Sequence, residues 1–449
     1  MHLNRRQITG LIIVTVIVSI VASPQYRSIV NVPHHLRLCP GQQMELSIDM
    51  PLQVEVNYDG ADIIELSGKQ TPQGWTLNLD EPIFINPLTT GKTRLEVKLF
   101  GLIPLKQVVV EVLPEVRLMP GGHSIGVLLG KYGVLVVGDA AVRDGTRILH
   151  PARDAGLRKG DIILSVNSRP VYDDDDLVRY IDEAGRAGKA AVLEVHRDGQ
   201  TIMLTIEPVL CSQTKRYRIG LYVRDIAAGV GTMTFYDPLS RQYGALGHVI
   251  TSASDSAPMS IPDGRIVKAS VAGINQGKPG QPGEKIGTWR TPSDLLGNIE
   301  SNTPFGIVGV LNDDIAPNPH FSEPIPVGLR DTVKEGQAQI YTVLEGDRIE
   351  AFDIEIVDVN RNQDQPGPKS LKVKVTDQRL LQKSGGIVQG MSGSPIVQDG
   401  RLIGAITHVL INDPIHGYGV FIEWMLQNTT IIEGFGVETG RATQSKSAA

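Results

Sequence analysis

Apolar and polar residues alternate in short runs along much of the chain, and Gly and Pro residues separate these runs. Residues 46–50, 54–58, 75–79 and 94–99 are four such runs. Alternation with a period of two is typical of strands with one buried face, and Gly and Pro mark the turns between strands. The pattern therefore predicts that residues 24–114 form a small β-sandwich, which contains no candidate chemistry and acts as a spacer.

A different pattern occupies residues 115–210. Residues 151–167 predict a short helix, a turn and a strand, and residues 177–184 have helical spacing. Two further strands are joined by Asp198-Gly199, a pair that is typical of tight hairpins. The acidic run 173–176 precedes the helix, where negative charge suits the helix dipole, so we interpret it as a solvated helix start and not as a metal site.

Residues 211–436 are rich in Gly, Val and Ile in short runs, with turn residues at intervals of roughly 8–15 positions. This spacing predicts antiparallel barrels or sandwiches. Residues 437–449 are polar and are expected to form a tail. The whole chain is thus predicted to be mostly β and multidomain.

The N-terminus is predicted to carry an export signal. Arg5 and Arg6 precede an apolar run over residues 8–22, as in a secretory signal peptide or a signal anchor. Pro24 directly after Ser23 argues against cleavage there, so residues 1–23 are predicted to be an uncleaved anchor that exports the rest of the chain. The run is short for a full span of roughly 20 residues, and a removed signal peptide is the alternative.

Charge and cysteine content narrow the classes of function. The chain has 43 basic and 49 acidic residues and a formal net charge of −6, without a long basic patch, so nucleic acid is not an expected partner. Cys39 and Cys211 lie far apart and outside metal or redox motifs. No metal or cofactor is predicted. One disulfide and two buried free thiols both remain open.

A candidate nucleophile lies in Gly390-Met391-Ser392-Gly393-Ser394-Pro395, at a turn between two apolar runs. Glycines let the backbone approach a substrate and turn its N–H groups toward one point. The amides of Gly390 and Ser392 would then form an oxyanion hole. This element resembles the Gly-Asp-Ser-Gly-Gly-Pro element of chymotrypsin-like proteases. A simple Gly/Ser turn is the alternative.

A candidate general base precedes this serine. His248 follows Gly247 in a β-type run, 144 residues before Ser392, and the order His before Ser matches chymotrypsin-like enzymes. A half-buried strand histidine is the alternative. His408 and His416 follow the serine, and we expect them to compete poorly. Met391 stands where trypsin-like enzymes carry an Asp that pairs with a freed N-terminus, so that activation route is expected to be absent.

Residues 115–210 resemble a PDZ domain of the circularly permuted kind found in bacterial HtrA-type proteases, through Gly156-Leu-Arg-Lys-Gly-Asp-Ile-Ile163. The resemblance implies that Ser124, Ile125, Gly126 and Val127 form the carboxylate-binding loop, where a peptide adds a strand to the sheet edge. The alternative is a plain turn that enters a strand.

Five motifs resemble those of the stage IV sporulation protein B peptidases of spore-forming bacteria: residues 244–250, 376–381, 385–396, 404–409 and 417–426. The order of anchor, spacer, PDZ domain and peptidase domain resembles that family as well. The resemblance implies a chymotrypsin-like double β-barrel in residues 211–436 and a triad of His248, Asp377 and Ser392. Asp377 lies unusually close to the serine in sequence. The rival acids are therefore kept open: Asp313, Asp314, Asp353 and Asp358.

The resemblance also implies a function. Such peptidases are exported from the forespore into the space between two membranes. They cleave a membrane-protein regulator of an intramembrane metalloprotease, which leads to processing of a sigma-factor precursor, and they cleave themselves near the N-terminus with help from the PDZ domain. An HtrA-like quality-control protease and a non-catalytic PDZ scaffold are the alternatives.

Overall fold

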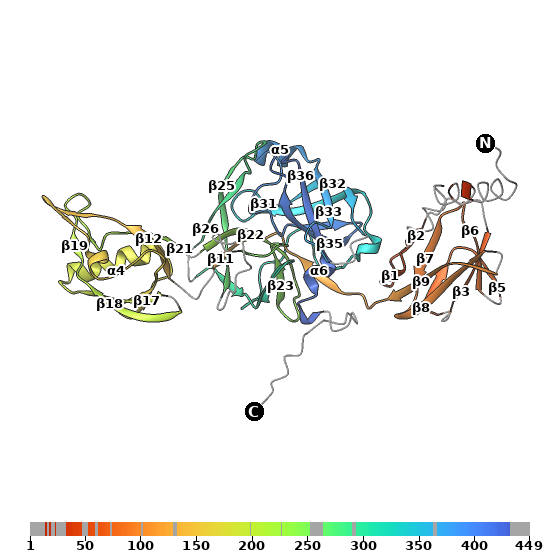
Figure 1. The fold of residues 1–449 in the computed structure, drawn as a ribbon, viewed down its shortest axis with the longest axis horizontal. Helices are drawn as coiled ribbons and strands as arrows, with labels where there is room; N and C mark the ends of the chain where they lie inside the picture. The colour runs from red at the N-terminus through yellow and green to blue at the C-terminus, as the bar shows by residue number, and fades with distance from the viewer. Residues whose placement is uncertain are drawn as a thin grey trace, which may run out of the picture.

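The computed structural model describes residues 14–15, 18, 23, 33–46, 53–58, 62–71, 74–99, 102–128, 133–197, 199–225, 227–251, 264–289, 293–361 and 366–431. These residues form three bodies that lie in a row, with the N-terminal sheets at one end, a large β body in the centre and a smaller unit around helix α4 at the other end (Figure 1). The predicted mostly β, multidomain class is confirmed.

The N-terminal body is a sandwich of two sheets, as predicted. The larger sheet has the order β1-β9-β8-β3-β6-β5 and the smaller β2-β7-β4. Alternate residues of strands such as β7 point into one apolar core that draws on both sheets, which explains the period-two pattern of the sequence. The strands are β1 (His35–Leu38), β2 (Met44–Leu46), β3 (Gln53–Tyr58), β4 (Ile64–Leu66), β5 (Lys69–Thr71), β6 (Gly74–Asn78), β7 (Ile83–Pro87), β8 (Gly91–Leu99) and β9 (Ile103–Val112).

The small unit at the other end has a sheet of order β18-β17-β15-β12-β21, with β16 beside β15. Asp173 caps α4 by accepting a hydrogen bond from the Asp176 N–H, which confirms that the acidic run is a helix start. Its elements are β12 (Val134–Asp139), β13 (Val142–Asp144), β14 (Arg147–Leu149), α3 (Pro151–Asp154), β15 (Ile162–Val166), β16 (Arg169–Pro170), α4 (Asp174–Arg186), β17 (Ala191–Arg197), β18 (Gln200–Ile206), β19 (Val209–Leu210), β20 (Tyr217–Arg218) and β21 (Leu221–Asp225).

The predicted bounds of this unit, 115–210, are wrong at both ends. Strand β21 lies beyond residue 210 but pairs with β12, so it belongs to the small unit. Strands β10 (Arg117–Pro120) and β11 (Ser124–Leu128) lie after residue 115 but pair with strands of the central body. The small unit is therefore inserted between β11 and β22 (Ala227–Tyr236) of the central body.

The first half of the central body is a curled sheet of order β27-β24-β11-β22-β23-β29-β28, with β10 and β30 at its margin. A bridge between Gly297 and Leu311 brings β27 near the end of β29, so the sheet approaches a barrel. The remaining elements here are β23 (Gln242–Ala245), β24 (Arg265–Lys268), β25 (Ser270–Asn275), β26 (Glu284–Thr288), β27 (Leu295–Asn298), β28 (Ser301–Thr303), β29 (Gly306–Val310) and β30 (Ile325–Pro326).

The second half is a closed barrel, β31-β32-β33-β36-β35-β34. Helix α5 connects β33 to the segment that carries Ser392, and the barrel contributes most of the residues of the largest apolar cluster in the described part of the chain. The elements are η1 (Arg330–Thr332), β31 (Gly336–Val343), β32 (Ile349–Val359), β33 (Leu371–Val375), α5 (Gln378–Ser384), β34 (Pro395–Gln398), β35 (Arg401–Val409), β36 (His416–Phe421) and α6 (Ile422–Leu426).

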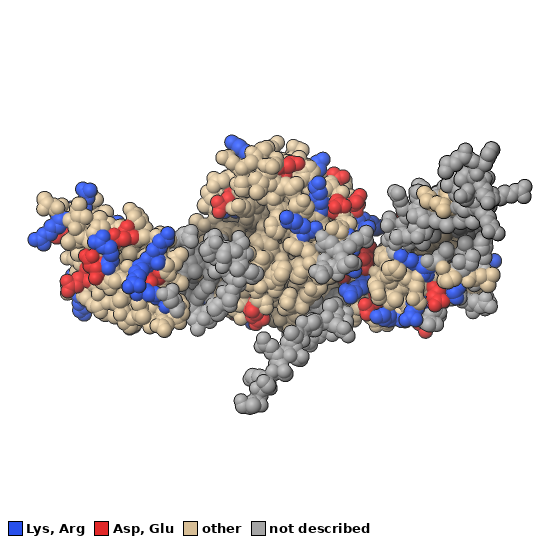
Figure 2. Space-filling view, viewed as in Figure 1, with Lys and Arg blue, Asp and Glu red and all other residues tan. Residues whose placement is uncertain are grey.

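Charged side chains are distributed unevenly over the face shown in Figure 2. Lys and Arg are interspersed with Asp and Glu on the two end bodies, whereas the central body shows a broad area without charge.

Cys39 and Cys211 are both buried and free, so the alternative of two free thiols holds.

The predicted anchor, residues 1–23, lies outside the described residues except for positions 14, 15, 18 and 23, and the tail 437–449 lies outside them entirely. Within the described ranges, the helices are too short or too polar to cross a bilayer.

Candidate functional site

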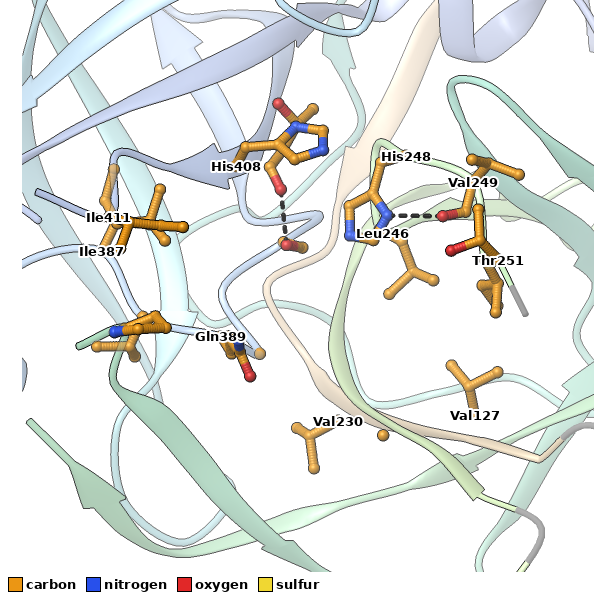
Figure 3. Close-up of a pocket in the computed structure, with 18 residues that line it drawn as sticks. Val127, Val230, Leu246, His248, Val249, Thr251, Ile387, Gln389, His408 and Ile411 are labelled. Atoms are coloured by element: carbon orange, nitrogen blue, oxygen red, sulfur yellow. Dashed lines mark hydrogen bonds between the residues drawn. The ribbon is translucent and has the colours of Figure 1, made fainter. Parts of the chain in front are cut away.

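A cavity of about 440 Å³ lies where the two halves of the central body meet (Figure 3). Leu246, His248 and Val249 line it from the first half, and Ser392 and His408 line it from the second. The structure thus brings together the predicted nucleophile and the predicted base, which are 144 residues apart in sequence.

The Ser392 segment is a tight loop between α5 and β34. Gly390 and Gly393 have φ values of 91° and 93°, in the left-handed region that favours glycine. Strand β22 holds the loop from the other half. The Thr232 N–H donates to the Ser392 carbonyl at 2.9 Å, and the Thr232 hydroxyl donates to the Gly390 carbonyl at 2.8 Å. The loop that carries the nucleophile is therefore positioned by both halves.

Two residues of this loop, Gly390 and Ser392, line the cavity with backbone amides that are unused within the described ranges. The Met391 N–H is used internally, since it donates to the Val388 carbonyl at 3.1 Å. In the described part of the chain, neither the Gly390 N–H nor the Ser392 N–H donates to an acceptor. Two free amides on either side of a bonded one are available to hold a developing oxyanion.

His248 is buried and oriented by its own backbone. Its Nδ1 lies 2.9 Å from the Val249 carbonyl oxygen, so Nδ1 carries the proton and Nε2 has the free lone pair. Figure 3 shows the other ring nitrogen on the side away from Val249, within the cavity. Burial lowers the pKa of His248, although the hydrogen bond to Val249 raises it. The neutral form, which can accept a proton, is therefore favoured at neutral pH.

The nucleophile and the base are not hydrogen-bonded in this state. The Ser392 hydroxyl donates to the Thr407 carbonyl at 2.8 Å, the dashed line below His408 in Figure 3. Thr407 lies at an irregularity in the pairing of β35 with β36, and such bulges redirect backbone groups beside active sites. Rotation of the serine side chain is needed before it can reach His248.

Asp377 is not where a triad acid would be. Its carboxylate accepts from the Arg379 backbone N–H at 2.8 Å as the N-cap of α5, and it pairs with the Arg379 guanidinium at 2.7 Å. Arg379 also lowers the pKa of Asp377. The His248 Nδ1 hydrogen bond goes to Val249 instead. The predicted contact between Asp377 and His248 is therefore absent, because Asp377 is committed to the start of a helix.

The rival acids do not replace it. Asp353 accepts from the Gln339 side chain at 2.9 Å, and Asp314 pairs with Arg241 at 3.2 Å. The lining of the cavity, as far as the described residues define it, includes none of Asp313, Asp314, Asp353 and Asp358.

His408, which the sequence predicts to compete poorly as a catalytic histidine, lies beside His248 in the cavity. Its ring centroid lies 5.2 Å from that of His248, and both rings line the cavity. Burial, with the nearby His248 as a smaller cause, lowers the pKa of His408 to about 4. Its Nδ1 is buried and has no hydrogen-bond partner within the described ranges. The bulge at Thr407 that turns this strand toward the serine has no signature in the sequence.

Lys285 was missed altogether. It is fully buried behind the serine loop, where its Nζ donates to the Thr342 hydroxyl at 2.7 Å, and burial lowers its pKa to about 7. A Cβ on Gly390 would lie only 3.0 Å from the Lys285 side chain. The aliphatic part of the Lys285 side chain therefore packs against the loop that carries Ser392.

The predicted carboxylate-binding loop is also wrong. Ser124, Ile125, Gly126 and Val127 lie in β11, which pairs with β22 on one side and β24 on the other. A strand that is paired on both sides cannot accept an added peptide strand. Val127 instead lines the cavity that holds Ser392.

A suitable loop lies at the other end of the small unit. Gly220, with φ of 78°, leads into β21, the last strand of its sheet. In the described part of the chain the N–H groups of Ile219 and Gly220 donate to no acceptor. Helix α4 packs beside this segment, because its Asp182 accepts from the Tyr217 N–H at 2.8 Å. A strand edge preceded by free amides suits a peptide with a terminal carboxylate.

Comparison with protein families gives two matches. Residues 215–426 match the family described as SpoIVB peptidase S55, and residues 130–207 match the PDZ domain family. Comparison with curated proteins gives no significant match.

Solved structures give partial similarity. They include the Rv3671c protease from M. tuberculosis in its active form (13% identity, TM-score 0.24, covering 48% of this chain and 75% of that chain). They also include the HtrA-type protease AlgW with a decapeptide, at 16% identity and a TM-score of 0.26, with 49% of this chain and 58% of that chain covered. Human heparin binding protein has 12% identity and a TM-score of 0.23, with 43% of this chain and 82% of that chain covered. These TM-scores are too low for a common fold to be inferred from them.

Proposed function

We propose that this serine peptidase, whose residues 215–426 match the SpoIVB peptidase S55 family and whose residues 130–207 match the PDZ domain family, is an endopeptidase with Ser392 as nucleophile and His248 as general base. One observation carries the assignment of these residues: His248, Gly390 and Ser392 line the same cavity, and in the described part of the chain the N–H groups of Gly390 and Ser392 are unused.

The geometry supports a two-step acyl transfer. The Ser392 hydroxyl rotates from the Thr407 carbonyl to the Nε2 of His248, which takes its proton as the oxygen attacks the substrate carbonyl. The N–H groups of Gly390 and Ser392 hold the resulting oxyanion. The imidazolium then gives its proton to the leaving amine. Water, activated in the same way by His248, hydrolyses the acyl-enzyme and restores the serine.

We further propose that the PDZ domain binds peptide C-termini through the amides of Ile219 and Gly220 and the edge of β21. Only residue 226 separates β21 from β22, the strand whose Thr232 holds the serine loop. Peptide binding at β21 is therefore expected to affect the position of the loop that carries Ser392. Met391 is fully buried and cannot accept an ion pair, so this connection would replace activation by a freed N-terminus.

The match of residues 215–426 to the SpoIVB peptidase S55 family supports a proposal for the biological role. The enzyme would be exported, held at the membrane by residues 1–23 or released from it, and act in the space between the two membranes of the forespore. It would cleave a membrane-protein regulator of an intramembrane metalloprotease, and so lead to sigma-factor processing. It would also cleave its own N-terminal region, presented through the PDZ domain.

Intact mass and N-terminal sequencing of the wild type beside Ser392→Ala test activity and self-processing together. Processing and fluorophosphonate labelling are expected in the wild type and are expected to be lost in Ser392→Ala. Equal processing in both proteins would refute the nucleophile. Broad degradation of denatured casein would favour an HtrA-like quality-control protease, and a wild type that resists the fluorophosphonate would favour a non-catalytic scaffold.

A further inference from the structure

The cavity around Ser392 has two sides with different tasks. Because His248 must protonate the leaving amine, the leaving half of the substrate lies on the His248 side, next to Val249 and Thr251. The residue that supplies the scissile carbonyl, called P1, must then extend to the opposite side. Figure 3 shows Ile387 and Ile411 on that opposite side.

The P1 side of the cavity is apolar. Ile387 and Ile411 line it, Val388 follows Ile387 directly in the chain, and Gln389 is the polar residue of this segment. Within the described residues, the lining of the whole cavity contains no Asp, Glu, Lys or Arg. A charged P1 side chain would lose water there without gaining an ion pair, whereas an aliphatic side chain would bury apolar surface.

We propose that the peptidase selects substrates with an uncharged aliphatic residue at P1, such as Val, Leu or Met, and that the 387–389 segment and Ile411 make this selection. The proposal rests on the proposed function, since it assumes that Ser392 and His248 act as described. Gln389 lies at the rim of this side, because it lines the cavity and is exposed to solvent. Its backbone is held in place, since its N–H donates to the Gly283 carbonyl and its carbonyl accepts from the Lys285 N–H.

Peptidyl phosphonates that differ only at P1 test this selectivity by their rate of Ser392 labelling. Val, Leu and Met probes are expected to react at least about tenfold faster than Asp, Glu, Lys and Arg probes. A simple fluorophosphonate, which has no P1 side chain, reports the reactivity of the serine separately. If it labels Ser392 but a charged probe reacts as fast as the aliphatic ones, the selectivity proposal is overturned. If it fails to label, the proposed function itself falls, and the selectivity proposal with it.

A charge change tests the assigned residues. Gln389→Glu is expected to improve labelling by the Lys probe relative to the Val probe by about tenfold, because it places a carboxylate beside P1. Gln337→Glu is the matched control, an exposed Gln outside the cavity lining, and should leave the ratio unchanged. An unchanged ratio in Gln389→Glu, or an equal change in the control, would show that residue 389 does not face P1.

A second inference follows from Asn302, in β28. Its side-chain amide donates to the Ile250 carbonyl at 2.8 Å, and its side-chain oxygen accepts from the Ile250 N–H at 2.9 Å. Ile250 directly follows Val249, whose carbonyl receives the His248 Nδ1–H. The His408 ring also lies next to His248, with 5.2 Å between the two ring centroids.

We infer that Asn302 is a positioning residue that performs the orienting task of a triad acid. By holding Ile250 at both backbone groups, it fixes the direction of the Val249 carbonyl, which in turn fixes the tautomer and the ring plane of His248. It supplies orientation without charge. This inference also rests on Ser392 and His248 acting as proposed.

Asn302→Ala tests this role. We expect fluorophosphonate labelling to slow by about tenfold or more, and the acid limb of its pH profile to move to lower pH, because loosening the Val249 bond removes an interaction that raises the His248 pKa. Asn298→Ala is the control, since Asn298 makes a similar side-chain bond to the Val310 N–H elsewhere in the same sheet. Equal rate losses in both variants with an unmoved pH midpoint would reduce Asn302 to a structural residue and overturn the inference. A wild type that does not label would instead remove the proposed function.

Discussion

The Asp377 carboxylate pairs at 2.7 Å with the guanidinium of Arg379, two residues further along the chain. The same carboxylate caps the N-terminus of helix α5. This helix leads directly into the loop that carries Ser392. Asp377 can therefore affect catalysis through the position of the loop, without touching His248.

The variant Asp377→Asn distinguishes a helix-capping role of Asp377 from a role as the acid of a catalytic triad. Asn caps helices as well as Asp, so labelling should stay within about tenfold of the wild type, whereas loss of a true triad Asp reduces kcat by about 10⁴. Asp377→Ala should lower the free energy of unfolding by about 1 kcal/mol, measured by denaturant titration. An Asp377→Asn protein as inactive as Ser392→Ala would restore Asp377 to the triad.

Thr232→Val tests the hold of β22 on the serine loop. The change keeps the side-chain shape and removes the hydroxyl that donates to the Gly390 carbonyl. We expect labelling to slow by about tenfold, because the oxyanion amides lose their alignment. Thr303→Val removes a comparable bond, to the Gly306 carbonyl, and should leave the labelling rate unchanged. Similar rates for both variants would argue against this role of β22.

Lys285 is predicted to act through its stem and not through its charge. Lys285→Met keeps the packing against Gly390 and should retain most of the activity. Lys285→Ala leaves a space behind the loop and should reduce the steady-state kcat several-fold. Because burial lowers the pKa of Lys285 to about 7, the Met variant should also have the higher Tm at pH 7. A greater loss of activity in the Met variant than in the Ala variant would implicate the amine.

Glu423 should make stability fall as pH rises. Burial raises its pKa from 4.5 to about 7, so the unfolded chain loses this proton at lower pH than the folded protein does. Stability is therefore lost between about pH 4.5 and 7 and stays lower above that range.

Glu423→Gln keeps an acceptor for the Arg330 N–H and removes this dependence. The Tm of the variant should exceed that of the wild type at pH 8 and approach it at pH 5. Exposed Glu335→Gln is the control and should follow the wild type at both pH values. If the Tm difference between the wild type and Glu423→Gln is the same at pH 5 and pH 8, the assignment is contradicted.

The corrected PDZ site predicts which changes affect peptide binding. Amidation of a bound peptide's C-terminus should weaken binding by about tenfold or more in calorimetry, because the amides of Ile219 and Gly220 prefer a carboxylate. Ser124→Ala, in the buried strand β11, should leave the affinity unchanged. A large loss of affinity in a well-folded Ser124→Ala protein would return the site to residues 124–127.

The sequence by itself determined the β character of the chain, the helix start at Asp173 and the loop around Ser392. These features depend on local rules: alternation with a period of two, capping side chains and glycines with positive φ. The motif also indicated His248, because chain order in this class of enzyme pairs a histidine with a later serine.

Only the tertiary structure decided which segments pair across the chain. Residues 124–127 and 221–225 are both short β-type runs that closely follow a glycine, and their sequences do not reveal that the first joins the peptidase sheet and the second the PDZ sheet. The same holds for Asp377 and Asn302. Whether a polar side chain caps a helix or holds a catalytic histidine depends on partners distant in sequence, and long-range packing selects those partners.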